Sequence, residues 1–216
     1  MQDLIPLVVA TRNKGKIAEI KNLLNDFPVI LKDLTNFGPI PTVPEDGDTF
    51  EENAYLKAGF TAKMLGYPTM ADDSGLVVEA LGGRPGIHSA RYAGENTGDE
   101  ERCRRILKEM KGTTNRKAAF HCVVSIAVPA GPALTYEARC EGLITEKPDG
   151  ENGFGYDPIF FYPPLGKTFA QMSMDEKNRV SHRGKVLREI RNEFEKILIW
   201  IRRHMPIEEK FPCATD

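Results

Sequence analysis

The sequence lacks a hydrophobic run long enough to cross a membrane. Its longest apolar runs, Cys122–Val128 and Ile197–Ile201, are far shorter than the roughly 18 residues that a spanning helix needs. The N-terminus also lacks the basic stretch, the apolar core and the small-residue cleavage site of a secretory signal. We therefore expect a cytoplasmic protein without a membrane partner.

Cysteine is scarce as well. The four cysteines, Cys103, Cys122, Cys140 and Cys213, lie far apart and form no CxxC pair. A zinc site or a disulfide framework would need closer or more regular spacing. The pattern favours reduced thiols in a cytosolic protein.

Neither sign of charge is in large excess. The chain has 29 basic and 31 acidic residues, a net charge of −2, which argues against nucleic acid as a partner. A small anionic ligand is still compatible with this balance, because a local cluster matters more than the sum. With 216 residues, 41% of them hydrophobic and 28% charged, the chain is typical of one globular domain or two small lobes.

Hydrophobic periodicity predicts strands and helices that alternate along the chain. Strands are expected at residues 7–10, 29–31, 69–71, 76–78 and 159–161, with a hairpin of 118–128 and 134–144. Helices are expected at residues 17–24, 50–65, 97–110 and 186–201. Three capping boxes, beginning at Thr49, Thr97 and Ser173, mark helix starts. This order predicts an α/β fold with a mixed sheet.

A polar, basic segment, Thr11–Lys16, separates the first expected strand from the first expected helix. Backbone N–H groups at a helix N-terminus bind anions, and Arg12, Lys14 and Lys16 add positive charge. The segment does not match a P-loop, which has a glycine earlier and a Ser or Thr after the lysine. Taken alone, it is explained equally well as a solvated basic turn.

Two adjacent carboxylates, Asp72 and Asp73, begin a turn that is expected at residues 72–75, between the strands at 69–71 and 76–78. Adjacent carboxylates repel unless a cation lies between them or one is protonated. Mg²⁺ takes such oxygens and keeps several waters, and a carboxylate beside one of those waters can act as a general base. The alternative is an Asp-rich turn.

Two further segments have weaker functional signals. The glycines of Gly153–Pro158 allow the backbone to approach a ligand closely, and an aromatic residue there can stack on a base. Lys177 and Ser181–Arg183 form a cationic cluster, in which arginine offers a fork of donors for phosphate or carbonyl oxygens. The alternatives are a turn whose aromatic residues fill the core, and a solvated helix start.

Taken together, seven motifs between about Leu7 and Ile190 resemble, in order, the inosine triphosphate pyrophosphatase family, whose members are also called dITP/XTP pyrophosphatases. They are Thr11-x-Asn13-x-x-Lys16, Thr49-Phe50-x-Glu52-Asn53-Ala54, Ala71–Leu76, Leu81-Gly82-Gly83-x-Pro85-Gly86, Ser89–Tyr92, Gly153–Pro158 and Ser181–Gly184. A single motif of this kind is weak evidence, whereas seven in sequence are specific.

The resemblance implies an elongated α/β fold, with a mixed β-sheet core flanked by helices and two lobes around a central active-site cleft. Residues 1–205 would form this single domain, and residues 206–216 a polar C-terminal tail. It also implies a Mg²⁺-dependent reaction in which water attacks the α-phosphorus and releases a nucleoside monophosphate and pyrophosphate. The implied substrates, ITP, dITP and XTP, contain deaminated purines, and the implied assembly is a cytosolic homodimer.

The resemblance also assigns individual residues. Asp73 matches the catalytic acid–base aspartate and metal ligand, Asp72 is given a supporting role, and Glu45 is the candidate for a further metal ligand. The implied substrate contacts are Thr11, Arg12, Asn13, Lys14, Gly15, Lys16, Ser74, Phe154, Gly155, Tyr156, Asp157, Lys177, His182 and Arg183. Arg12 departs from relatives, in which this position is often small.

Two other functions are weighed against this one. A non-catalytic nucleotide-binding module would need the cationic and glycine-rich segments but not Asp73, so the intact Asp72–Asp73 pair argues against it. The second alternative is a pyrophosphatase for another modified nucleotide, such as a pyrimidine triphosphate.

Overall fold

The computed structural model describes residues 4–94 and 97–205. The expected polar tail at residues 206–216 therefore lies outside the described residues. The main helices are α1 (Lys14–Leu23), α2 (Phe50–Leu65), α3 (Asp99–Glu109), α4 (Met174–Val180) and α5 (His182–His204).

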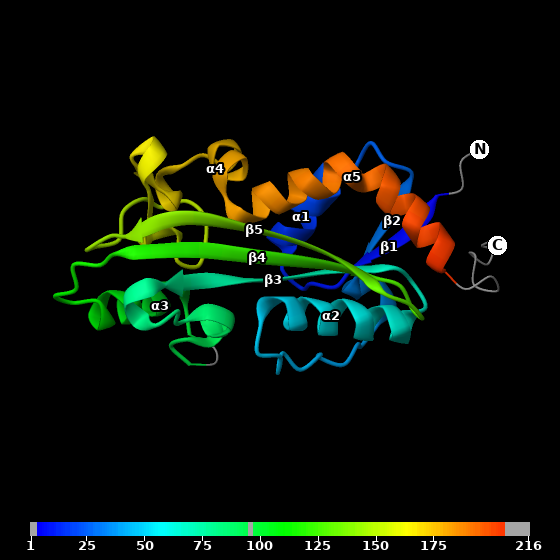
Figure 1. Cartoon of the computed structure of the whole chain (residues 1–216), viewed down its shortest axis with the longest axis horizontal. Coiled ribbons are helices and arrows are strands. Elements are labelled where there is room, and N and C mark those ends of the chain that lie inside the picture. The colour runs from blue at the N-terminus through cyan, green and yellow to red at the C-terminus, as the bar shows by residue number, and fades with distance from the viewer. Residues whose placement is uncertain (1–3, 95–96, 206–216) are drawn as a thin grey trace. The chain divides into compact units, whose positions relative to one another are not determined.

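The strands form one mixed sheet in the order β2-β1-β3-β4-β5-β6-β7 (Figure 1). They are β1 (Ile5–Val9), β2 (Val29–Asp33), β3 (Thr69–Val78), β4 (Lys117–Ala127), β5 (Ala133–Ile144), β6 (Phe160–Tyr162) and β7 (Lys167–Thr168). Strand β1 pairs in parallel with β2 and β3, whereas β6 pairs antiparallel with β5 and β7. The predicted α/β class with a mixed sheet is confirmed.

The chain divides into two compact units. The first unit consists of residues 1–73, 123–136 and 186–216, and the second of residues 74–122 and 137–185. Strand β3 passes from the first unit to the second between Asp73 and Ser74. Asp72 and Asp73 thus belong to the first unit, and Ser74 is the first residue of the second unit.

In the first unit, helices cover both faces of the strands: α2 lies on one side, and α1 and α5 lie on the other (Figure 1). Small residues let α2 approach closely, because Ala58 and Ala62 pack against Ala71 of β3 and Ala127 of β4. On the other side, Phe194 of α5 contacts Phe27, with 4.7 Å between ring centroids. These contacts support the end of β3 that carries the two aspartates.

The second unit is built around an aromatic core. The rings of Phe120, Phe160 and Phe169 lie 4.6–5.7 Å apart, and Cys103, on the buried side of α3, packs in the same cluster. Aromatic side chains bury much area at a small entropic cost. This core gives the loops of the second unit a rigid base.

Two local predictions are wrong. The turn expected at residues 72–75 is extended, because β3 runs without interruption from Thr69 to Val78. The capping box at Thr97 does not form either: the N-cap of α3 is Gly98, with no side-chain cap, and the Thr97 hydroxyl donates to the carbonyl of Gly94. By contrast, the Ser173 box is complete.

The structure also bears on two features that are scarce in the sequence, long apolar helices and cysteines. Among residues 4–94 and 97–205, no helix has both the length and the apolar character that crossing a bilayer requires. Cys103, Cys122 and Cys140 are buried, and none of these three described cysteines forms a disulfide. Cys213 lies outside the described residues.

Candidate active site

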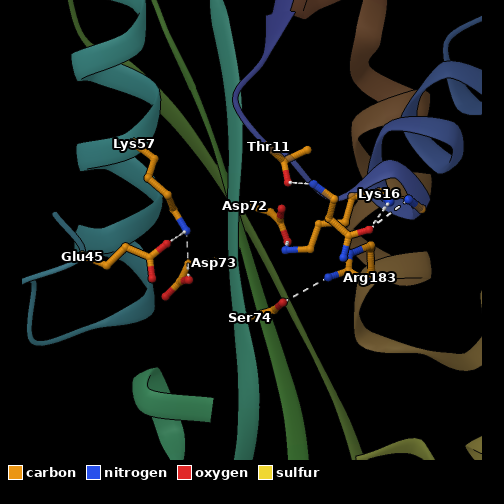
Figure 2. Close-up of polar contacts among 10 residues, drawn as sticks. Thr11, Lys16, Glu45, Lys57, Asp72, Asp73, Ser74 and Arg183 are labelled. Carbon is orange, nitrogen blue, oxygen red and sulfur yellow. Dashed lines mark hydrogen bonds and ion pairs between the residues drawn. The ribbon is translucent and has the colours of Figure 1, made fainter. Parts of the chain in front are cut away.

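Asp72 and Asp73 point to opposite sides of β3 (Figure 2), because successive side chains of a strand alternate between its faces. Asp72 Oδ2 accepts a hydrogen bond from Lys16 Nζ at 2.7 Å, and Asp73 Oδ1 accepts one from Lys57 Nζ at 3.0 Å. Each carboxylate therefore has its own cation. This arrangement explains why an uninterrupted strand replaces the expected turn.

Lys57 is the centre of a partly buried charge cluster in the first unit. Its Nζ contacts Asp73 Oδ1 and also donates to Glu45 Oε1 at 2.9 Å (Figure 2). Burial raises the pKa of Asp73 and outweighs the opposing effect of Lys57. Burial alone would lower the pKa of Lys57, but the charges of Asp73, Glu45 and Asp72 outweigh burial and raise it. Lys57 therefore keeps its positive charge beside Asp73.

Lys57 is not among the predicted site residues, although its position on α2 carries a signal. It lies three residues after Ala54 and four before Thr61, so it shares their face of the helix. Ala54 and Thr61 are both buried. A lysine on a buried helical face needs an acidic partner, and this requirement could have linked it to the aspartates.

The loop that carries Glu45 is attached to α2. Asn53 accepts a hydrogen bond from the backbone N–H of Gly47 and donates to its carbonyl, at 2.9 and 3.4 Å. Glu52 accepts from the N–H of Asp48 at 2.7 Å. A side chain at position 47 would collide with Glu52, since a Cβ there would lie 2.7 Å from the Cβ of Glu52. These contacts bring Glu45 within reach of Lys57.

One oxygen of the cluster has no partner. Asp73 Oδ2 is buried and makes no hydrogen bond to any described residue. Buried carboxylate oxygens are normally paired, so an unpaired one suggests a ligand or a cation. Within the described residues, no three His, Cys, Asp or Glu side chains are grouped closely enough to hold a metal by themselves.

The segment between β1 and α1 forms an ordered helix start. Asn13 Oδ1 accepts hydrogen bonds from the N–H groups of Gly15 and Lys16, at 2.9 and 3.2 Å, and Thr11 Oγ1 accepts from the N–H of Asn13 at 3.2 Å. Arg12 donates to the carbonyl of Ile40 at 3.1 Å. The Asn13 side chain is thus engaged in capping. Of Lys14, only the backbone is described.

A cavity of about 210 Å³ lies beside this helix start in the first unit. Three cationic side chains (Arg12, Lys16 and Lys57) and two carboxylates (Glu45 and Asp72) are among its lining residues. Cations exceed carboxylates in this lining, so the cavity suits an anionic group. Of the predicted phosphate and metal residues, Thr11, Arg12, Lys16 and Glu45 line this cavity, whereas Asp73 is not part of its lining.

The predicted base loop lies in the second unit. Asp157 is buried and accepts a hydrogen bond from the N–H of Phe154 at 2.9 Å, and it forms an ion pair with Lys177. Burial raises the pKa of Asp157, against the effect of Lys177. Gly153 has φ of +80°, and a Cβ there would lie 2.0 Å from Asp157 Oδ2. The glycine is therefore required for this contact.

The Phe154 ring is 45% exposed and has cations near it. Lys177 Nζ lies 4.5 Å from its centroid and the guanidinium carbon of Arg183 lies 5.8 Å from it. Arg183 also donates to Ser74 Oγ at 3.1 Å (Figure 2). These side chains form an aromatic and cationic surface in the second unit.

Two of the predicted contact residues are buried in the second unit. Tyr156 is buried and its hydroxyl donates to the carbonyl of Ser89 at 2.8 Å, and the His182 ring stacks on Phe120 with centroids 4.7 Å apart. Their side chains support the loops around them.

Comparison with known proteins gives consistent results. The model of the Ham1 family matches residues 7–193. A "dITP/XTP pyrophosphatase" of Syntrophobacter fumaroxidans is 60% identical over 195 residues, which are 90% of this chain and 84% of that protein. Another, of Desulfotalea psychrophila, is 52% identical over 99% of this chain and 95% of its own length.

Solved structures show the same fold. The Staphylococcus aureus Ham1 protein is 42% identical, with a TM-score of 0.83 over 89% of this chain and 99% of its own. A HAM1 protein from Coxiella burnetii is 40% identical, with a TM-score of 0.86 over 89% of this chain and all of its own.

Proposed function

This chain belongs to the Ham1 family, and we propose that it hydrolyses dITP, XTP and ITP to the nucleoside monophosphate and pyrophosphate. The family and the pyrophosphatase class predicted from the sequence are confirmed by its relatives. The observation that carries the proposal is the buried Asp73 carboxylate, which has one oxygen on Lys57 and the other unpaired. The expected role is removal of deaminated purines from the nucleotide pool.

The cationic cavity of the first unit is the proposed triphosphate site. A nucleoside triphosphate carries about four negative charges, and charge-assisted hydrogen bonds from Lys and Arg are among the strongest in proteins. Arg12 and Lys16 supply such donors in the cavity. The N-terminus of α1, including Gly15, adds backbone N–H groups and a positive dipole end. Thr11, Asn13 and Lys14 complete this segment.

The residues present fit a magnesium ion. Mg²⁺ prefers carboxylate oxygens and binds through one or two of them while it keeps several waters. Asp73, with its unpaired Oδ2, and Glu45 are the groups that would hold it. When bound, the ion supplies positive charge to the triphosphate at the reacting phosphorus.

Asp73 is the proposed general base. Its carboxylate takes a proton from the water whose oxygen attacks the α-phosphorus. As that P–O bond forms, the bond between the α-phosphorus and its bridging oxygen breaks, and pyrophosphate leaves with the electron pair. Burial makes Asp73 a stronger base than an exposed aspartate, while Lys57 favours the ionised form that can accept a proton.

The loop of the second unit is the proposed base site. Phe154 can stack on the base, and Arg183, His182 and nearby N–H groups are candidate donors to a 6-oxo group. Adenine presents an amino group there, so donor would face donor. Guanine shares the 6-oxo group, but its unpaired 2-amino group would cost about 1–3 kcal/mol when buried. ITP, dITP and XTP are therefore preferred over GTP, and GTP over ATP.

The remaining proposed contacts of the second unit have distinct roles. Ser74 lies next to the general base and holds Arg183. Lys177 joins Phe154 to the buried Asp157, and Gly155 and Tyr156 shape the loop between them.

A panel of nucleoside triphosphates tests this function. Purified protein with Mg²⁺ is incubated with ITP, dITP, XTP, GTP, ATP and dUTP, and pyrophosphate and monophosphate are quantified. We expect the three deaminated purine nucleotides to give the highest kcat/KM. Equal cleavage of ATP or GTP, or a preference for dUTP, would reject the proposed base site. Binding without pyrophosphate release would support a non-catalytic module instead.

The metal requirement has its own test. A chelator should abolish pyrophosphate release, and added Mg²⁺ should restore it. Full activity after exhaustive chelation would show that Asp73 and Glu45 work without a divalent cation.

We also propose that the protein acts in the cytoplasm as a homodimer, with residues 1–205 as one pyrophosphatase domain and without nucleic acid or membrane as partner. The balanced charge and the reduced cysteines support this setting. Light scattering at micromolar concentration should give about twice the chain mass of 24.1 kDa. A monomer mass would reject the dimer.

A further inference from the structure

Helix α3 is hydrogen-bonded to the base loop, Gly153–Pro158. It binds both backbone polar groups of Gly155, the N–H and the carbonyl. Asp99 Oδ2 accepts a hydrogen bond from the N–H of Gly155 at 2.6 Å. The thiol of Cys103, one turn further along α3, donates to the carbonyl of Gly155 at 3.3 Å. Residues four apart on a helix lie on the same face, so a single face of α3 holds this glycine.

Asp99 is itself oriented by a neighbour. Its Oδ1 forms an ion pair with Arg102, and Arg102 also donates to the carbonyls of Ala90 and Thr97, at 2.9 and 2.8 Å. One carboxylate oxygen is therefore fixed by the arginine while the other holds the loop. The exposed surface of a helix start has no need of such a network.

The thiol of Cys103 is suited to the same task. Burial, helped by the charges of Asp99 and Asp157, raises the pKa of Cys103 to about 12. The sulfur therefore keeps its proton at any physiological pH, and it can donate to a carbonyl without reacting as a thiolate.

The held residue is next to Phe154, the exposed ring of the loop. Gly155 has φ of +63°, a conformation in which glycine is favoured. The N–H of Phe154 is bound by Asp157, so successive backbone N–H groups are bound by two different carboxylates. Because both of these N–H groups are fixed, the direction in which the Phe154 ring points is also set.

We propose that Asp99 and Cys103 are positioning residues for base recognition, which act by holding the Gly155 peptide and thereby orienting Phe154. This inference rests on the proposed function, because it assumes that Phe154 contacts the nucleobase. Neither residue belongs to the motifs that carry the resemblance, and both lie in the second unit.

The test compares variants of the full chain. Asp99→Ala removes the acceptor for Gly155, and Glu100→Ala is its matched control, since Glu100 lies in the same first turn of α3 and pairs with Arg104. Asp99→Asn keeps an oxygen acceptor. Cys103→Ala removes the donor, whereas Cys103→Ser keeps one.

Two measurements separate positioning from a general loss of structure. The first is kcat and KM for ITP and ATP; the second is calorimetric binding of inosine monophosphate and, separately, of pyrophosphate. For Asp99→Ala we expect KM for ITP and the Kd of inosine monophosphate to rise about tenfold, as for loss of a hydrogen bond to a charged group. Values of kcat and pyrophosphate binding should stay within about twofold, and the preference for ITP over ATP should fall.

The remaining variants sharpen the expectation. Cys103→Ala should raise KM for ITP about threefold, in keeping with a weaker neutral donor, while Cys103→Ser, Asp99→Asn and Glu100→Ala should stay near wild type. The inference is overturned if Asp99→Ala behaves like Glu100→Ala. It is also overturned if both alanine variants weaken monophosphate and pyrophosphate binding equally and lower the Tm, which would indicate a merely structural role.

Failure of the proposed function would look different. In that case the wild-type protein would release no pyrophosphate from any nucleotide and would not bind inosine monophosphate, and the inference would fall with it. A fully active wild type with unaffected variants would reject the inference alone.

Discussion

The two units hold their candidate site residues in different ways. In the first unit, charged side chains from separate elements meet one another: Lys16 with Asp72, and Lys57 with Asp73 and Glu45. In the second unit, the buried carboxylate Asp157 and the helix α3 bind the backbone of a glycine-rich loop. The residues of the first unit are held by ion pairs between side chains, and the loop of the second by hydrogen bonds to its main chain.

This difference matches the tasks proposed for the residues of the two units. Ion pairs between side chains can exchange partners when a phosphate or a cation arrives, because the same charges serve both states. A base of fixed shape is better recognised by a preorganised surface, since ordering a loop during binding costs affinity. Changes in the first unit should therefore alter the rate for every nucleotide, whereas changes in the second should alter the choice among them.

The largest effect is expected from Asp73→Asn. The amide keeps the shape of the carboxylate but cannot act as a base, so kcat should fall at least about 100-fold for ITP and ATP alike. Burial of the ionised carboxylate costs folding free energy at neutral pH, since the pKa of Asp73 is raised, so the Tm should not fall. Pyrophosphate release and thermal unfolding are measured together.

Asp26→Asn is the control for this variant, because Asp26 lies in the same unit and pairs with Arg191 at the surface. Near-normal turnover of Asp73→Asn with Mg²⁺ present would remove Asp73 from the chemistry.

The next effect concerns Lys57→Met. Loss of the ammonium leaves Asp73 and Glu45 without their shared cation, and a buried carboxylate that loses its partner is costly. We expect kcat to fall roughly tenfold to a hundredfold, with an unchanged ratio of ITP to ATP activity. Lys63→Met, an exposed lysine on the same helix, should leave both rates intact. A change in base preference would show that the first unit also affects the choice of nucleotide.

A smaller effect is expected from Phe154→Ala, and it should fall on KM rather than on kcat. Base stacking on an aromatic ring is worth about 1–3 kcal/mol, so KM for ITP should rise at least about fivefold while kcat changes little. Leu165→Ala is the control, because Leu165 is also in the second unit and equally exposed. If Phe154→Ala lowers kcat for all nucleotides without changing KM, the ring does not read the base.

The sequence alone predicts the features that depend on local signals, but not those that depend on tertiary packing. Local signals sufficed for α2, because Thr49 and Gly66 mark its two ends. Adjacent acidic residues sufficed to mark the pair Asp72–Asp73, and the family resemblance assigned the catalytic role to Asp73. Lys57 lies on a buried face of α2, which indicates that it needs an acidic partner. It was missed because the partner becomes evident only when α2 packs beside β3.

The errors have the same origin. Asp72–Gly75 has the composition of a turn, yet lysines from two helices neutralise its carboxylates on opposite faces and the strand continues. The side chain of Thr97 is likewise engaged elsewhere, since its hydroxyl donates to the carbonyl of Gly94 and leaves Gly98 as the N-cap of α3. In both cases contacts made in the fold override the local preference.

The smallest effect is expected at Glu176, in the second unit. Glu176 completes the capping box of α4, the helix that carries Lys177, and pairs with Lys167. The hydrogen bonds that Glu176 accepts from Lys167 and from the N–H of Ser173 lower the pKa of Glu176 to about 2.

A carboxylate with a lowered folded-state pKa stabilises the fold above its unfolded pKa, and this stabilisation is lost as the pH falls toward the folded value. Glu176→Gln should therefore unfold at a slightly lower temperature than wild type at pH 7, and the difference should shrink between about pH 4.5 and pH 2. Because this side chain is at the surface, the shift should be no more than a few degrees, and it should leave kcat for every nucleotide unchanged. Thermal unfolding followed across this pH range measures it, and a difference that grows on acidification would contradict the assigned sign.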